Sequence, residues 1–249
     1  GSGQVNRAIR KEVQIGDCRL LLGDCLEVME SLDVTPDVVI TDPPYGIEEM
    51  VGGYGRGGVH KIKNDKTLDF ALDCLNLCGR LWTDLRVIAF YSCKVTPAFL
   101  GGVTELDYFG EIIWDKKVPG LGANFRYQHE NAAIFTKGNP PPIGVGFSVT
   151  SCMRTPDLHP HQKPIPLMQQ LVKVSAGQTI LDPFCGSGST GVACAMMGKK
   201  FIGIELDERY FDIACRRIHE AYAQPDMFAE YREPLVGQQQ PLFASEVAP

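Results

Sequence analysis

Residues 41–46 hold the side chains best suited to chemistry, and they read Thr-Asp-Pro-Pro-Tyr-Gly. The apolar run at 38–40, Val-Val-Ile, has the length and β-branched content of a buried strand. Two prolines then end that strand, because proline lacks a backbone N–H and fixes its own φ. The pattern therefore predicts a rigid turn that holds a carboxylate, Asp42, and an aromatic ring, Tyr45, at one strand end.

Such a turn suits a nucleobase that carries an exocyclic amino group. The Asp42 carboxylate and the carbonyl groups of the turn can accept hydrogen bonds from the amine, and the Tyr45 ring can stack on a flat heterocycle. The alternative is an ordinary Asp-Pro turn that ends a strand. The tetrapeptide alone leaves both interpretations open.

A second turn, at 182–191, reads Asp-Pro-Phe-Cys-Gly-Ser-Gly-Ser-Thr-Gly and joins an expected strand at 179–182 to an expected helix at 189–197. Its glycines let the backbone turn tightly and let a ligand approach closely. Its hydroxyl groups and the first amides of the helix would face that ligand. A glycine-rich turn without a ligand is the alternative here.

Gly186, Gly188 and Gly191 also match the G-x-G-x-x-G fingerprint of dinucleotide sites, so NAD or FAD is a rival ligand. However, Asp182 would repel a pyrophosphate, whereas it suits a cofactor that bears a cationic amine or sulfonium. Glu205 ends the next expected strand and could hold ribose hydroxyls of either ligand. The chain has no Gly-Lys-Ser/Thr, which excludes a P-loop.

Asp-Pro-Pro-Tyr followed by Asp-Pro-Phe-x-Gly-x-Gly resembles the β-class DNA amino-methyltransferases, which use S-adenosylmethionine and place the catalytic half before the cofactor half. Three further stretches are similar to motifs of this family and occur in its order: Leu22–Leu26, His159–Pro164 and Phe201–Glu205. The resemblance covers residues 12–220. It implies an α/β fold with a Rossmann-like, seven-stranded, mostly parallel sheet, helices on both faces and a circularly permuted order of motifs.

The resemblance also assigns roles to residues. The catalytic residues are Asp42, Pro43, Pro44 and Tyr45. The residues that bind S-adenosylmethionine are Asp24, Cys25, Lys163, Asp182, Phe184, Gly186, Ser187, Gly188, Ser189, Thr190 and Glu205. In this family the His159–Pro164 element lies beside the methionine part of the cofactor, and the strand end at Glu205 carries the acid that binds ribose.

The implied reaction transfers a methyl group to an exocyclic amine of a base flipped out of duplex DNA. In the family, Asp-Pro-Pro-Tyr mostly accompanies N6-adenine methylation and Ser-Pro-Pro-Tyr mostly N4-cytosine methylation, so Asp42 favours adenine. Cytosine N4 is the first alternative; an RNA methyltransferase, a catalytically silent DNA-binding protein and an oxidoreductase are others. Cell-cycle-regulated adenine methyltransferases are the most similar subgroup, but the chain has no counterpart of their C-terminal DNA-reading domain.

Two stretches are left to read the DNA sequence. Residues 46–66 form a glycine-rich loop that carries Arg56, Lys61 and Lys63, which we expect to contact phosphates. Residues 138–158 lack periodicity and are expected to be a short target-recognition insertion. With so little recognition surface, a homodimer is expected; the recognition site and any partner restriction nuclease are not indicated.

Composition sets the remaining limits. The chain has 249 residues, 44% of them hydrophobic, and fits one methyltransferase domain at 4–223 with a flexible tail at 224–249. Its net charge of −6 argues against loose, charge-driven binding of nucleic acid. The nine cysteines include no CxxC and no ligand spacing for a metal, so they indicate reduced core thiols and no metal site.

With no membrane-length apolar stretch and no signal peptide, the expected location is the cytoplasm of a bacterium, for a bacterial or phage-encoded enzyme.

Overall fold

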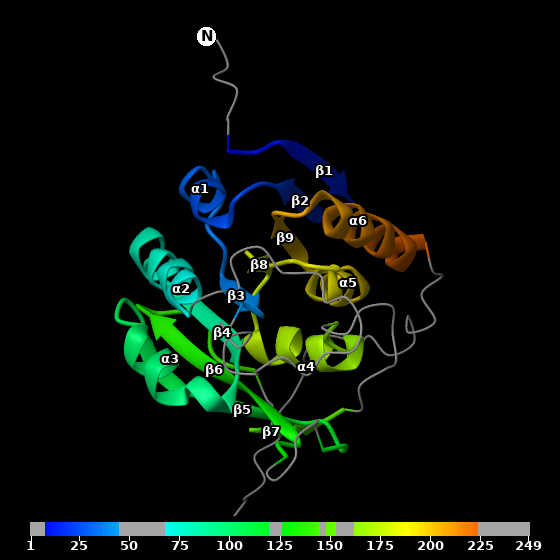
Figure 1. Ribbon diagram of the computed structural model, residues 1–249. Coiled ribbons are helices and arrows are strands. Elements are labelled where there is room, and N and C mark those ends of the chain that lie inside the picture. The colour runs from blue at the N-terminus through cyan, green and yellow to red at the C-terminus, as the bar shows by residue number, and fades with distance from the viewer. Residues whose placement is uncertain (1–7, 45–67, 120–125, 145–147, 153–161, 224–249) are drawn as a thin grey trace, which may run out of the picture.

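The structure is a computed structural model, and it describes residues 8–44, 68–119, 126–144, 148–152 and 162–223. These residues build one sheet with helices on both of its faces (Figure 1). The sheet has nine strands in the order β1-β2-β9-β8-β3-β4-β6-β5-β7. The strands are β1 (Lys11–Ile15), β2 (Cys18–Leu22), β3 (Val38–Thr41), β4 (Leu85–Tyr91), β5 (Asp107–Asp115), β6 (His129–Lys137), β7 (Val149–Ser151), β8 (Thr179–Asp182) and β9 (Lys200–Glu205).

The seven central strands form the mostly parallel sheet that the sequence predicts. β2, β9, β8, β3 and β4 run parallel to one another, and β6 runs antiparallel to both β4 and β5. The structure adds one strand at each edge: β1 pairs antiparallel with β2, and β7 pairs parallel with β5. The sheet is therefore two strands wider than the seven expected.

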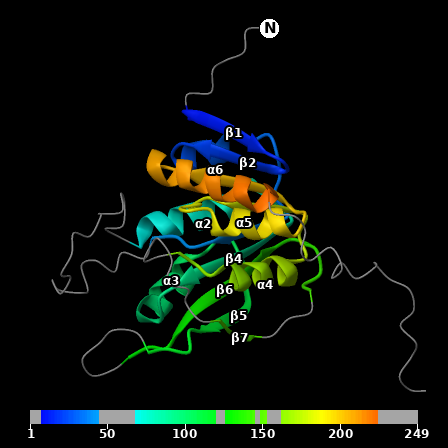
Figure 2. The same cartoon turned by 90° about the vertical axis from the view of Figure 1, so that its right-hand side faces the viewer.

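The helices divide equally between the two faces of the described sheet. α1 (Cys25–Glu30), α2 (Asp69–Leu81) and α3 (Thr96–Gly102), which follows the short 3-10 helix η2 (Cys93–Val95), pack on one face. α4 (Ile165–Ser175), α5 (Ser189–Met196) and α6 (Glu208–Ala223) pack on the other, and Figure 2 views the molecule from their side. The resulting α/β/α layers match the expected fold class.

The central strands are buried on both sides, which explains their continuous apolar sequences. All four residues of β3 and all seven of β4 are buried. Alternate side chains of β3 point to opposite layers: Val38 and Ile40 join the core under α4–α6, and Val39 joins the core under α1–α3. Because the five parallel strands point the same way, their carboxyl ends meet at one edge of the sheet, where open α/β sheets bind their ligands.

Most expected elements occur within a few residues of their predicted bounds. The helix expected at 189–197 is found at Ser189–Met196, and the strand expected at 179–182 is β8. Residues 138–158 were expected to be irregular, but they include β7. The loop expected at 46–66 and the tail expected at 224–249 both lie outside the described residues. In the described part of the chain, no helix combines the length and apolar character needed to cross a membrane.

Candidate active site

The Asp42 turn follows directly from the buried strand β3. The hydroxyl of Thr41, the last residue of β3, donates a hydrogen bond to Asp182 Oδ1 at 3.0 Å. Asp42 comes next, with 26% of its side chain exposed, and the buried Pro43 follows. This contact places the start of the Asp42 turn beside the start of the glycine-rich turn, although the two are far apart in sequence.

The Asp182 carboxylate is held by three uncharged donors at the end of β8. It accepts hydrogen bonds from the Thr41 hydroxyl, from the Thr190 hydroxyl at 2.6 Å and from the backbone N–H of Phe184 at 3.1 Å. Burial raises the pKa of Asp182 to about 6, with the nearby negative charge of Asp42 acting in the same direction, although the three donors oppose the shift. Burial, more than the charge of its neighbours, therefore sets the raised pKa of Asp182.

The glycines after Asp182 take backbone conformations that other residues avoid. Gly186 has φ +53° and Gly188 has φ +81°, both in the left-handed region. A Cβ on Gly188 would meet Ala214 of α6 at 2.9 Å, whereas a Cβ on Gly186 would meet only the Phe184 carbonyl oxygen, at 3.9 Å. Gly188 is thus required for packing against α6, and Gly186 leaves open space beside the turn.

Glu205, the last residue of β9, is hydrogen-bonded to the segments that follow β8, β9 and β2. Its carboxylate accepts hydrogen bonds from the backbone N–H groups of Gly186 and Asp207, each at 2.8 Å, and its backbone carbonyl accepts from Gly23 N–H at 2.9 Å. Burial raises the pKa of Glu205 above its usual value, although these backbone donors oppose the shift. The expected ribose acid is therefore fixed beside both the glycine turn and the end of β2.

The other residues expected at the cofactor lie around this turn but differ in what their side chains contact. Asp24 caps α1 by accepting from the N–H of Leu26 at 3.0 Å, whereas Cys25 is buried in the core under α1 and α2. The Phe184 ring packs edge-on against Phe70, with ring centroids 5.8 Å apart.

The serine and threonine hydroxyls of the turn are engaged within the protein. Ser187 accepts hydrogen bonds from Arg217 of α6 through its carbonyl at 2.5 Å and its hydroxyl at 3.0 Å. The Ser189 hydroxyl accepts from Arg217 at 3.5 Å, and Thr190 is committed to Asp182. In this structure the backbone of the turn, more than its hydroxyls, is the part that can meet a ligand.

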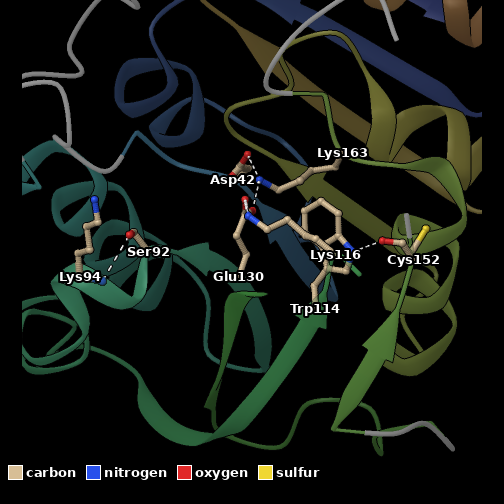
Figure 3. A network of polar contacts seen from close by, with 8 residues as sticks. All are labelled: Asp42, Ser92, Lys94, Trp114, Lys116, Glu130, Cys152 and Lys163. Carbon is tan, nitrogen blue, oxygen red and sulfur yellow. Dashed lines mark hydrogen bonds and ion pairs between the residues drawn. The ribbon is translucent and has the colours of Figure 1, made fainter. Parts of the chain in front are cut away.

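Lys163, which the sequence assigns to the cofactor, contacts Asp42. Its Nζ lies 2.5 Å from Asp42 Oδ2 and 3.1 Å from Glu130 Oε2 (Figure 3). Lys116 Nζ lies 3.0 Å from Glu130 Oε1. Sequence reasoning missed Glu130 and Lys116, which belong to none of the family motifs; the only signal was a pair of charged residues at the ends of two apolar strands.

Several expected site residues lie outside the described residues. They are Tyr45, Arg56, Lys61, Lys63 and His159. The structure therefore brings together Asp42, Lys163, Asp182, Glu205 and the glycine turn, and the aromatic and basic residues expected to hold the base and the DNA stay predictions.

Comparisons with known proteins identify the family of the chain. A family model for DNA methylases of the N6/N4 class matches residues 146–216. The type II methyltransferase M2.DpnII of Streptococcus pneumoniae is 45% identical over 226 residues, which cover 73% of this chain and 82% of that protein. The protein YubD of Escherichia coli (strain K12) is 31% identical over 212 residues, covering 80% of this chain and 89% of its own length. The chain belongs to the N6/N4 DNA methylase family. The family expected from the sequence is confirmed at this level.

Solved structures of methyltransferases share the fold. The complex of M1.HpyAVI with S-adenosylmethionine has a TM-score of 0.61 at 22% identity and covers 81% of this chain and 99% of its own. The cytosine-N4-specific PvuII DNA methyltransferase has a TM-score of 0.63 at 15% identity, covering 86% and 95%. At these identities the likeness establishes the α/β methyltransferase fold and leaves the target base open.

Proposed function

We propose that this N6/N4 DNA methylase transfers a methyl group from S-adenosylmethionine to the N6 amine of adenine in duplex DNA, after the base has been flipped out of the helix. The observation that carries the proposal is the hydrogen bond from Thr41 to Asp182 at 3.0 Å. It supports a single site in which the Asp42 turn receives the amine and the glycine turn receives the cofactor.

The residues of the glycine turn fit S-adenosylmethionine, the cofactor that the family uses and with which M1.HpyAVI was solved. The cofactor is cationic, and Asp182 is a carboxylate held by uncharged donors. Glu205 already accepts two backbone N–H groups, but a carboxylate has about four lone-pair sites, so ribose hydroxyls can still bind. The open side of Gly186 admits a ligand close to the backbone. S-adenosylmethionine supplies an electrophilic methyl group on a sulfonium.

The chain's own residues orient the amine. We propose that the Asp42 carboxylate and the Pro43 carbonyl accept its two N–H groups, while Tyr45 stacks on the base. These hydrogen bonds localise the nitrogen lone pair, which is otherwise delocalised into the ring, and direct it at the methyl group. The methylated amine must lose a proton, and we propose that the Asp42 carboxylate accepts it. Positioning of this kind supplies a large part of the rate without a covalent enzyme intermediate.

DNA contacts belong to the same proposal. Arg56, Lys61 and Lys63, in the loop at 46–66, would neutralise phosphates, and the segment at 138–158 would read bases. We further propose, from the resemblance to the family, that the enzyme acts as a homodimer. Light scattering tests the dimer: a monomeric mass both with and without DNA contradicts it.

N4-cytosine methylation is the second candidate, because the family includes methylases of both bases and the cytosine-N4-specific PvuII methyltransferase shares the fold. Against it, the residue that starts the Pro-Pro-Tyr turn here is Asp42, the variant that the family associates with adenine. Both bases present the same chemical group, a planar amine conjugated with a ring, so the same residues would serve either reaction.

Nucleoside mass spectrometry after incubation of unmethylated duplex DNA with S-adenosylmethionine and the wild-type protein tests the proposal. We expect N6-methyladenine. N4-methylcytosine would keep the mechanism and change the base, whereas unmodified DNA together with measurable binding of S-adenosylmethionine would contradict a DNA substrate. RNA, incubated in parallel, would then show whether the substrate is another nucleic acid.

A further inference from the structure

A chain of alternating charges runs from Lys116 through Glu130 and Lys163 to Asp42. The successive contacts are 3.0 Å from Lys116 Nζ to Glu130 Oε1, 3.1 Å from Lys163 Nζ to Glu130 Oε2 and 2.5 Å from Lys163 Nζ to Asp42 Oδ2. Figure 3 shows the four side chains converging at the carboxyl edge of the sheet. No step of the proposed methyl transfer uses Lys116, Glu130 or Lys163.

The Lys163 ammonium is enclosed by rigid groups. Only 11% of its side chain is exposed, and its Nζ lies 4.7 Å from the centre of the Phe90 ring and 6.0 Å from that of Trp114. The Trp114 ring is itself fixed, because its Nε1 donates to the Cys152 carbonyl at 2.8 Å. Aromatic faces attract a cation, and leaving a buried charge without its partners is costly. The ammonium group of Lys163 is therefore held in one position by residues of β4, β5 and β6.

Glu130 stays charged in this setting and so provides a permanent partner for Lys163. Burial alone would raise the pKa of Glu130, but the ammonium groups of Lys163 and Lys116 outweigh it and lower the pKa to about 2. Burial likewise acts to lower the pKa of Lys163, but Asp42 and Glu130 raise it above its usual value. At neutral pH the ion pairs are therefore intact.

We propose that Lys163, held by Glu130, is the positioning residue of the catalytic carboxylate Asp42. The ammonium fixes Oδ2 of Asp42 relative to the sheet and thereby sets the direction in which the carboxylate accepts the target amine. A carboxylate has about four lone-pair sites, so it can bind Lys163 and the amine together. This role rests on the proposed function, because it requires that Asp42 receive an amine.

The proposal differs from a role of Lys163 in binding the cofactor, which the sequence motif implies. A cofactor contact would appear as weaker binding of S-adenosylmethionine. A positioning residue affects an interaction that matters in the transition state, so its loss lowers kcat and leaves ground-state binding unchanged. A third possibility, that Lys163 blocks Asp42 until the base displaces it, predicts faster transfer once the lysine is removed.

The experiment compares Lys163→Met, Lys163→Arg and the wild-type protein by single-turnover methyl transfer to duplex DNA, and by calorimetric titration with S-adenosylmethionine. We expect Lys163→Met to lower the single-turnover rate about 10- to 100-fold, because small misplacements of reacting groups have effects of this size. The Kd for S-adenosylmethionine should stay within about twofold of wild type. Lys163→Arg, which keeps the charge, should recover part of the rate.

Lys11→Met is a matched control. Lys11 also has a carboxylate partner, Asp212 at 2.8 Å, and an aromatic ring, Phe211 at 5.2 Å, but it is exposed and belongs to the edge strand β1. Its replacement should leave both the transfer rate and the cofactor affinity unchanged. Thermal unfolding of each variant checks that the fold is retained.

Glu130→Gln gives a second, independent test that remains informative if Lys163→Met does not fold. It should lower the transfer rate less than Lys163→Met does. The double variant should raise ΔG‡ by less than the sum of the two separate increases, because both residues act through one chain of contacts. The positioning role would be overturned if folded Lys163→Met transferred methyl groups at an unchanged or faster rate, or if it lost only cofactor affinity. In either case, activity of the wild-type protein on DNA would still support the proposed function. A wild-type protein inactive on DNA would overturn both.

Discussion

Glu130 and Asp182 are two carboxylates at the same edge of the sheet, and the protein holds them in opposite ways. Glu130 lies within 3.1 Å of two ammonium groups, those of Lys116 and Lys163. Asp182 accepts instead from two hydroxyls and one backbone N–H. Asp182 is buried and Glu130 is half-buried, but the cations lower the pKa of Glu130 to about 2, whereas burial raises that of Asp182 to about 6.

The difference separates the tasks of the two halves of the site. On the proposed catalytic side each negative charge has a cation of the protein itself, which fixes the groups that we propose to orient the amine. On the cofactor side the negative charge of Asp182 is balanced by no ion pair within the described residues. A cationic cofactor would complete that balance, and this explains why a carboxylate can occupy a turn that otherwise resembles a phosphate-binding one.

The largest effect on cofactor affinity should follow from removing Glu205. In Glu205→Ala the N–H groups of Gly186 and Asp207 lose their acceptor, and the ribose loses its expected partner. We expect the Kd for S-adenosylmethionine to rise about 10- to 100-fold, the range for lost hydrogen bonds to a charged group. Calorimetry measures it, with Glu208→Ala, an exposed residue of α6, as the control. Unchanged affinity in a folded Glu205→Ala protein would show that this strand end does not bind the cofactor.

The pH dependence of cofactor binding tests the charge balance at Asp182. The cation should bind best when Asp182 is ionised, so affinity should be constant above about pH 6 and fall below it, by at most about tenfold per pH unit. Asp182→Asn should bind more weakly and remove this dependence between pH 5 and 7, where ordinary carboxylates stay ionised. If Asp182→Asn retained the wild-type pH profile, the titrating group would lie elsewhere, and Glu205, whose pKa is also raised, would be the next to replace.

The two carboxylates should also contribute to stability with opposite signs. The lowered pKa of Glu130 means that its ionisation stabilises the fold above its unfolded value of 4.5, and that this contribution is lost as the pH falls toward 2. The raised pKa of Asp182 means that its contribution is greatest below its unfolded value of 3.8 and is lost as the pH rises toward 6. Thermal unfolding of Glu130→Gln and Asp182→Asn across pH 3 to 7 should show these opposite trends against wild type, and equal trends would refute the contrast.

The smallest effects should come from alanine at the two left-handed glycines. The two variants should rank in opposite order for thermal stability and for cofactor binding. Both changes impose backbone strain of about 1 kcal/mol, but only the Cβ of Gly188→Ala also meets Ala214, at 2.9 Å. Gly188→Ala should therefore lower the unfolding temperature more, and Gly186→Ala, whose Cβ points into open space, should weaken cofactor binding more. The same rank order in both measurements would argue against a ligand beside Gly186.

Local sequence patterns predicted most of the fold, because the central strands are continuous apolar runs and the turns carry proline or glycine. β7 escaped prediction, since three residues with no apolar run become a strand only by pairing with the exposed edge of β5. Candidate site residues could be proposed from the sequence where their motifs are contiguous, as at Asp42 and Asp182, and their roles stay predictions. The ion pairs of Lys163 were not, because Asp42 and Glu130 approach it from distant parts of the chain, and only the folded sheet brings them together.

The most direct test of one shared site is the single-turnover rate of methyl transfer by Asp42→Ala at saturating S-adenosylmethionine, with cofactor binding established by titration. We predict that this variant binds the cofactor with a Kd within about threefold of wild type and transfers methyl groups at least about 100-fold more slowly. A rate close to wild type would show that Asp42 does not orient the amine, and the account of the site would be wrong.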